Sequence, residues 1–341
     1  MLIKDRYDVL DKIGSGTFGS VHRALDRVTG EQVAIKFLIK TDTIDHFRKE
    51  ANFLYQQINN RFVVKLLDHD LDAKEPYIVL EYCHGGSLRS WVGRKNPWQQ
   101  IANALSCATS GLSEIHKNGG FHRDIKPDNL LMTTDSATGL SVIKLGDLGL
   151  ARMPSAGSMT YSPAGTKHYM APEVRKALID PSEDSYQYTQ SADIYSLGIT
   201  ALELSTGEVK LKALERLGED NFPRSLIDLI RRMCASKPES RPNTEIIAKE
   251  LCVLLAPPPP PISRREGNIA PLILHPKVVQ PQPVERAAPP NQQGDNTGAV
   301  IAGIGLGALA LLGLAALLTE SKEWDPSVER YRDANGRFRR S

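Results

Sequence analysis

The chain has 341 residues, 41% hydrophobic and 24% charged, so it can bury one large core or two modest ones and is not disordered throughout. Its formal net charge of +2 gives no electrostatic footprint for nucleic acid, which we exclude as a partner. The four cysteines form no C-x-x-C pair and predict neither a zinc site nor a redox dithiol. The first residues lack the apolar run of a secretory signal, which predicts a cytosol-like compartment for the region after them.

A glycine-rich segment lies near the start of the chain. Residues 14–21 fit G-x-G-x-x-G-x-V, in which missing side chains let backbone N–H groups approach phosphate oxygens. Structural turns and dinucleotide-binding folds carry similar glycines, but a dinucleotide fold needs a helix directly after them. Here residues 21–25 and 32–38 read as strands around a turn, which favours a loop that covers nucleotide phosphates. The predicted contacts in this loop are Gly14, Ser15, Gly16, Thr17, Phe18, Gly19 and Val21.

Lys36 lies inside the second of these apolar strands, where a lysine is either an exposed edge charge or a functional cation. A helix predicted over residues 43–58 carries a stripe of apolar residues at helical spacing, with Glu50 at its edge. The stripe consists of Ile44, Phe47, Ala51, Leu54 and Ile58. We expect Glu50 to pair with Lys36 and to hold its ammonium group near the nucleotide phosphates.

Residues 77–83 read as a further strand that runs into a Gly-Gly turn. By its position it predicts the connection between two lobes, whose backbone would meet an adenine edge.

The strongest signal is the run His-Arg-Asp-Ile-Lys-Pro-Asp-Asn at residues 122–129, followed eighteen residues later by Asp-Leu-Gly at 147–149. Phosphoryl transfer requires oxygen ligands for metal ions, a residue that orients the attacking hydroxyl, and a cation near the leaving phosphates. These two segments, together with Lys36, contain all of those groups. They therefore predict a phosphoryl-transfer site.

With Ala-Pro-Glu at 171–173, these motifs stand in the order of eukaryotic-type (Hanks-type) serine/threonine protein kinases, which residues 7–255 resemble. The resemblance implies an α+β, two-lobed fold with a small β-rich N-lobe and a larger, mostly helical C-lobe, and ATP and Mg²⁺ as cofactors. It implies that Asp124 orients the acceptor hydroxyl, that Asn129 and Asp147 hold the Mg²⁺ ions, and that Lys126 offsets charge at the γ-phosphate. The other nucleotide-site residues implied are Ala34, Lys36, Glu50, Glu81, Cys83 and Leu131.

The resemblance also bears on the substrate. Residues 124–129 and 165–173 resemble serine/threonine-type kinases, and the activation segment over 147–173 favours protein substrates over small molecules. Matching family positions imply that Arg241 pairs with Glu173 and that Asp193 anchors the catalytic loop, while His122 is a packed scaffold residue. Leu148 stands where the family usually has Phe, a swap that keeps an apolar packing residue. Two alternatives remain open: a nucleotide-binding pseudokinase or scaffold, and a small-molecule phosphotransferase.

Arg123 precedes the predicted base, and a phosphate on the activation segment can pair with an arginine at this position. The candidate acceptors are Ser155, Ser158, Thr160 and Ser162, with autophosphorylation of Thr160 or Ser162 in trans as the hypothesis. Thr166 is expected to bond to Asp124 and Lys126 instead.

The C-terminal quarter differs in composition. Residues 256–297 contain 11 prolines in 42 residues and predict a Pro-rich juxtamembrane linker. Residues 298–318 are 21 uninterrupted Gly, Ala, Val, Ile and Leu residues, long enough for a transmembrane helix, and 319–341 form a short basic tail. The tail's basic residues favour a cytosolic C-terminus, but the need for ATP favours a single-pass protein with a cytoplasmic kinase domain. Gly303 and Gly307 form G-x-x-x-G, which predicts a homodimer through this helix.

Overall fold

The computed structural model describes residues 2–15, 19–38, 44–135, 138–148, 166–179, 188–218 and 221–257. The predicted linker beyond 257, the apolar segment at 298–318 and the tail lie outside these ranges. So do Gly16, Thr17 and Phe18 of the glycine-rich segment and the candidate phosphoacceptors at 155–162. Within the described residues, no helix combines the length and the apolar character needed to cross a membrane.

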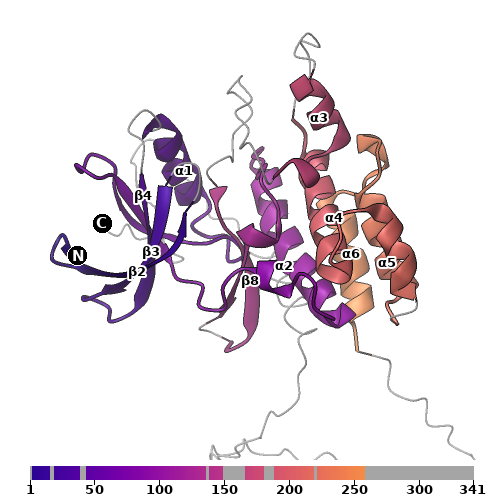
Figure 1. Cartoon of the computed structure of the whole chain (residues 1–341), viewed down its shortest axis with the longest axis horizontal. Helices are drawn as coiled ribbons and strands as arrows, with labels where there is room; N and C mark the ends of the chain where they lie inside the picture. Colours follow the sequence, from indigo (N-terminus) through magenta and orange to yellow (C-terminus); the bar gives the residue numbers. More distant parts are fainter. Residues whose placement is uncertain are drawn as a thin grey trace, which may run out of the picture. The chain divides into compact units, whose positions relative to one another are not determined.

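The N-lobe is built on a six-stranded antiparallel sheet with the strand order β1-β2-β3-β4-β6-β5. Its strands are β1 (Leu2–Ile3), β2 (Tyr7–Ser15), β3 (Gly19–Asp26), β4 (Gln32–Leu38), β5 (Leu66–Asp70) and β6 (Tyr77–Glu81). The strand predictions at 21–25 and 32–38 are confirmed. The third, at 77–83, is confirmed up to Glu81, and residues 82 and 83 continue outside the strand. Figure 1 shows β2, β3 and β4 side by side.

Helix α1 (Ile44–Gln56) belongs to the same lobe. Its stripe residues Phe47, Ala51 and Leu54 are buried, as predicted. Ile58 is an exception, with 43% of its surface exposed. The helix ends two residues earlier, so the chain has already turned and helical spacing no longer directs Ile58 toward the core.

The C-lobe is mostly helical, and its helices α2 (Trp98–Lys117), α4 (Gln190–Thr206), α5 (Arg224–Met233) and α6 (Thr244–Leu255) pack together (Figure 1). Helix α4 is buried on all of its faces from Ala192 to Leu204 and is therefore the central helix. It ends at Gly207, which takes the left-handed conformation (φ 75°) that favours glycine at this position. The remaining elements are α3 (Pro172–Ile179) and the short 3-10 segments η2 (Leu88–Trp91), η3 (Pro127–Asn129), η5 (Thr166–His168), η6 (Leu211–Gly218) and η7 (Pro238–Ser240).

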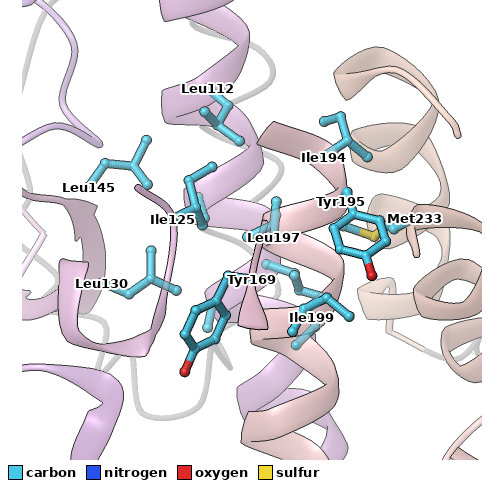
Figure 2. Close-up of a cluster of buried hydrophobic side chains, with 14 of the residues drawn as sticks. Leu112, Ile125, Leu130, Leu145, Tyr169, Ile194, Tyr195, Leu197, Ile199 and Met233 are labelled. Atoms are coloured by element: carbon cyan, nitrogen blue, oxygen red, sulfur yellow. The ribbon is translucent and has the colours of Figure 1, made fainter. Parts of the chain in front are cut away.

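A two-stranded antiparallel hairpin, β7 (Leu130–Thr134) and β8 (Ser141–Leu145), lies between the sheet and the helices. Leu130 and Leu145 form the pair of its register nearest its open end. Both side chains join one continuous hydrophobic core with residues of α2, α4 and α5, part of which is drawn in Figure 2. Leu148, the departure from the usual Phe, is fully buried in the same core. The hairpin is thus fixed by packing, and so are the residues that flank it.

Candidate active site

The predicted pairing of Lys36 with Glu50 is confirmed. Lys36 Nζ lies 2.6 Å from Glu50 Oε1 and 3.0 Å from Asp147 Oδ1. Both members of the first pair are buried, whereas half of the Asp147 side chain is exposed. Burial would lower the pKa of Lys36, but the negative charges of Asp147 and Glu50 outweigh it and raise that pKa. Lys36 is therefore a fixed cation beside an accessible carboxylate.

The hairpin register explains why two residues far apart in the sequence meet. Leu130 faces Leu145, so the residues just outside this pair, Asn129 and Gly146, also lie opposite each other. The Gly146 N–H donates to the Asn129 carbonyl at 2.9 Å. Asp147 comes directly after Gly146 and adopts φ 52°, an uncommon left-handed conformation for a residue other than glycine. Packing of the hairpin thus brings Asn129 and Asp147, the predicted metal ligands, to one end of it.

Asp124 lies at the centre of the catalytic loop. Its Oδ2 accepts hydrogen bonds from Lys126 Nζ at 2.7 Å and from Asn129 Nδ2 at 2.9 Å. Its Oδ1 is buried and has no hydrogen-bond partner among the described residues. Asp124 also lines a small cavity together with Tyr169 and Met170. Because a buried oxygen without a partner is costly, this atom is a ready acceptor for a hydroxyl that enters from outside the protein.

Asp193 anchors the catalytic loop, as the family resemblance implied. The N–H groups of His122 and Arg123 donate to its two carboxylate oxygens, each at 2.9 Å. The ring of His116 and the hydroxyl of Tyr188 bind the same carboxylate at 2.9 Å. Burial alone would raise the pKa of Asp193, but these hydrogen bonds and the nearby histidines hold it below its usual value. The loop is therefore held by a fully buried anion.

His122 is a scaffold residue, as expected. It is fully buried, and burial lowers its pKa, which keeps the ring neutral at neutral pH. Its Nδ1 accepts the Asp124 N–H at 3.3 Å, so it shapes the loop from within.

The predicted nucleotide-site residues that are described lie on the sheet and its connection to the C-lobe. Register places Gly14 opposite Val21, Val21 opposite Lys36, and Ala34 opposite Leu80. Gly19 needs its missing side chain, because a Cβ there would lie 2.3 Å from the Phe37 carbonyl oxygen. Ser15, the last residue of β2, faces Ser20 on β3.

The connection after β6 is tied to the hairpin. Ser87 forms a bridge with Leu131, and the Gly85 N–H donates to the Met132 carbonyl at 2.9 Å. Cys83 is buried, and burial raises its pKa to about 12, so it stays a thiol. The Oε1 atom of Glu81 accepts from Lys144 Nζ at 2.6 Å and from the Lys65 N–H at 2.8 Å, so these two bonds hold the Glu81 side chain in place.

These residues fit a metal-bound nucleoside triphosphate. Magnesium is usually held by one or two carboxylate or carbonyl oxygens together with substrate phosphates. Asp147 supplies an accessible carboxylate. The amide nitrogen of Asn129 donates to Asp124, which leaves its amide oxygen as a ligand. Among the described residues, no group of three or more His, Cys, Asp or Glu side chains could hold a metal without such help.

The site as a whole defines a phosphotransferase of the protein kinase class, with a fixed cation, a metal-binding pair and a loop carboxylate open to a hydroxyl. Comparison with known proteins places the chain more closely. Residues 7–252 match the model of the protein kinase domain, well over half of the sequence, so the chain belongs to the protein kinase family.

Three relatives illustrate the similarity. Serine/threonine-protein kinase cst-1 of Caenorhabditis elegans is 34% identical over 205 residues, which cover 59% of this chain and 38% of that protein. Serine/threonine-protein kinase ppk11 of Schizosaccharomyces pombe is 31% identical over 266 residues, 72% of this chain and 81% of that protein. Serine/threonine-protein kinase PknL of Mycobacterium tuberculosis (strain ATCC 25618 / H37Rv) is 34% identical over 216 residues, 60% and 50% respectively.

Except for ppk11, the chain spans about two fifths to half the length of the curated relatives it matches. The family match and the names of these relatives confirm the resemblance to serine/threonine protein kinases that the motifs indicated.

Several residues of the site could not be found from the motifs. His116 and Tyr188 bind the anchoring aspartate, and Lys144 occupies the side chain of Glu81. Arg89 and Glu203 form an ion pair at 2.8 Å across 114 residues. None of these residues stands in a recurring pattern, so only the contacts reveal them.

Proposed function

We propose that this chain is an active protein kinase that transfers the γ-phosphoryl group of ATP to serine and threonine hydroxyls of proteins. The observation that supports this best is the state of Asp124. One of its oxygens is fixed by Lys126 and Asn129, and the other is buried without a partner among the described residues. A pseudokinase has no need for such an oxygen, because it has no hydroxyl to align.

Each residue of the site has its own part in the transfer. An acceptor alcohol donates its hydrogen bond to Asp124 Oδ1, which orients the hydroxyl oxygen for in-line attack on the γ-phosphorus of ATP. As the new oxygen–phosphorus bond forms, Asp124 takes up the proton, the bond from the γ-phosphorus to the β-phosphate oxygen breaks, and ADP leaves. Lys126, bound to the other oxygen of Asp124, offsets the negative charge that develops on the transferred group. Asn129 and Asp147 would hold Mg²⁺, which would supply positive charge to the phosphate oxygens. Lys36, fixed by Glu50, orients the phosphates on the leaving side.

The test is phosphate transfer by the purified full chain. Mg-ATP with a labelled γ-phosphate is offered together with a panel of basic proteins and, separately, a panel of soluble metabolites. We expect label on serine and threonine of the proteins. Label on metabolites only would support the small-molecule phosphotransferase, and no transfer at all with intact nucleotide binding would support the scaffold.

Loss of the Lys36 cation gives a separate prediction. Lys36→Met is expected to lower kcat/KM for phosphotransfer by about 10²- to 10³-fold, the usual effect of removing one preorganised electrostatic group. Glu50→Gln keeps a hydrogen-bond acceptor but loses the charge that fixes the lysine, so a smaller loss is expected. The matched control is Lys4→Met, which removes an exposed lysine of the same lobe that pairs with Asp70. Steady-state kinetics on one peptide measures the loss of kcat/KM in each variant, which should be largest for Lys36→Met, smaller for Glu50→Gln and absent for Lys4→Met. Equal rates for Lys36→Met and Lys4→Met would contradict the prediction.

We also propose regulation by autophosphorylation of the activation segment at Thr160 or Ser162. The support is Arg123, whose guanidinium stacks on Tyr188 with 4.9 Å to the ring centroid and on Phe121 with 5.8 Å. Its Nε is buried without a hydrogen-bond partner among the described residues. A guanidinium that is positioned by aromatic rings and still has an N–H group without a partner among the described residues is suited to bind a phosphate. Mass spectrometry of protein incubated with Mg-ATP tests this, and a fully active protein without phosphate on residues 155–162 would remove the proposal.

We propose further that residues 298–318 tether the kinase domain to a membrane as a single-pass helix with the domain cytoplasmic, and that Gly303 and Gly307 pair two such helices. Their length and composition support the span. Protease protection of a C-terminal tag in sealed vesicles tests the topology, because a tail that has crossed is shielded. Crosslinking of the wild-type chain against Gly303→Ile tests the dimer.

A further inference from the structure

A cluster of charged residues lies beside the proposed acceptor site and is not used by the mechanism above. We name it the Arg89 cluster; its members are Arg89, Asp128, Tyr169 and Glu203. They come from four separate segments of the C-lobe: η2, η3, the residues just after η5, and α4. Tertiary packing alone brings them together.

Arg89 binds every other member. Its Nε and Nη2 donate to Asp128 Oδ2 at 3.1 and 2.6 Å. Its Nη1 donates to Glu203 Oε1 at 2.8 Å, and its Nη2 also lies 2.7 Å from the Tyr169 hydroxyl. That hydroxyl in turn donates to Glu203 Oε2 at 2.5 Å. One guanidinium therefore binds two carboxylates through different N–H groups.

The charges shift one another as expected for close pairs. Burial tends to raise the pKa of Asp128, but the hydrogen bond and charge of Arg89 outweigh it and lower that pKa. The hydrogen bond from Arg89 to Asp128 is the largest cause that raises the pKa of Arg89. Arg89 and Asp128 are therefore charged at neutral pH. Two carboxylates face one guanidinium, so the formal charges of the cluster sum to one net negative charge.

The cluster lies next to the catalytic loop that contains Asp124. Asp128 belongs to the same short turn as Asn129 and comes two residues after Lys126. Tyr169 lines the small cavity that also contains Asp124. Arg89 and Asp128 keep 38% and 45% of their side chains exposed, so a substrate side chain can reach them. Glu203 is only 11% exposed and is the most deeply buried charged member of the cluster.

From these contacts we infer that Arg89 is a specificity-determining residue, because it fills from within the chain a carboxylate site that would otherwise bind an arginine of the protein substrate. The inference rests on the proposed kinase activity and deepens it by naming the substrate class. The wild-type enzyme then gains little from a basic residue near the acceptor. Removal of the Arg89 charge exposes Asp128 and Glu203 and creates a preference for arginine, since guanidinium–carboxylate pairs are strong and geometrically specific.

The experiment compares peptides rather than absolute rates. A peptide with one threonine among alanines is compared with a set that carries a single arginine at each of the five positions before and after the threonine. The readout is the ratio of kcat/KM for each arginine peptide to that of the alanine peptide. Wild type, Arg89→Met and Arg89→Lys are assayed together, with Arg232→Met as the control that removes an exposed arginine paired with Glu250 on the far helices.

The largest ratio is expected to rise about tenfold in Arg89→Met, the effect of one charge-assisted pair, at one or two adjacent positions only. Arg89→Lys retains the positive charge but loses the planar, two-pronged donor geometry of the guanidinium, so it should give a smaller rise in the ratio. Arg232→Met should give no rise. Adding Asp128→Asn to Arg89→Met should remove most of the gain, which assigns it to the exposed carboxylate. Unchanged ratios at every position, or an equal loss of activity on all peptides in both Arg89 variants, would overturn the inference. Wild-type activity on the alanine peptide reports the proposed function separately.

Discussion

Asp124→Asn is expected to lower kcat by about 10²- to 10⁴-fold, the range that general base catalysis contributes. The amide has nearly the same shape and can still accept the bonds that Lys126 and Asn129 donate to Oδ2. What it cannot do is take a proton at the position of Oδ1, the oxygen that has no partner among the described residues. The chemical step is therefore lost while the loop keeps its structure. Single-turnover phosphotransfer measures the loss of the chemical step. Nucleotide affinity reports whether the loop keeps its structure.

The matched control is Asp72→Asn, which makes the same change at an exposed aspartate paired with Arg48. It should leave both kcat and nucleotide affinity unchanged. A residual kcat in Asp124→Asn within about threefold of wild type would mean that general base catalysis is not Asp124's role. A loss of nucleotide affinity as large as the loss of kcat would instead assign Asp124 to nucleotide binding.

The second large effect is on stability. Arg241 has no exposed side-chain surface and donates to both oxygens of Glu173, at 2.6 and 2.8 Å. It also donates to the carbonyl groups of Ala235, Ser191 and Ser236, so all five of its N–H groups are used. Its guanidinium stacks on Tyr195 with 4.9 Å to the ring centroid. Arg241→Ala is expected to destabilise the domain by about 3 to 5 kcal/mol, because it removes a fully buried guanidinium and leaves a carboxylate that is only 17% exposed without its partner.

For a domain of this size, each kcal/mol shifts Tm by about 2–4 °C, so a fall of about 6–20 °C is expected in a thermal unfolding scan. The double variant Arg241→Met with Glu173→Gln should recover a substantial part, since removing both charges costs less than removing one. Arg232→Ala, which breaks an exposed pair with Glu250, serves as the control and should cost no more than about 1 kcal/mol. A fall in Tm no larger than that of this control would show that the Arg241–Glu173 pair is not a structural link.

Local patterns were enough to predict the main parts of this protein. The motifs at 122–129 and 147–149 gave the class of chemistry, because phosphoryl transfer accepts few residue types at few spacings. Apolar alternation and helical spacing gave the strands at 21–25 and 32–38, the helix after residue 43 and the position of Glu50 at the edge of its buried face. Ile58 was assigned wrongly because a periodic pattern does not mark where its helix ends.

Long-range packing decided the rest. Asn129 and Asp147 meet because the register of β7 and β8 is set by leucines packed in the core, and no motif states that register. The anchoring of the loop by His116 and Tyr188, and the pairing of Arg89 with Asp128 and Glu203, join residues up to 114 positions apart. Single charged or polar residues of this kind have no periodicity to reveal their partners. The sequence alone therefore determined which reaction is built into the chain, whereas only the folded chain determined which side chains are left open to a substrate.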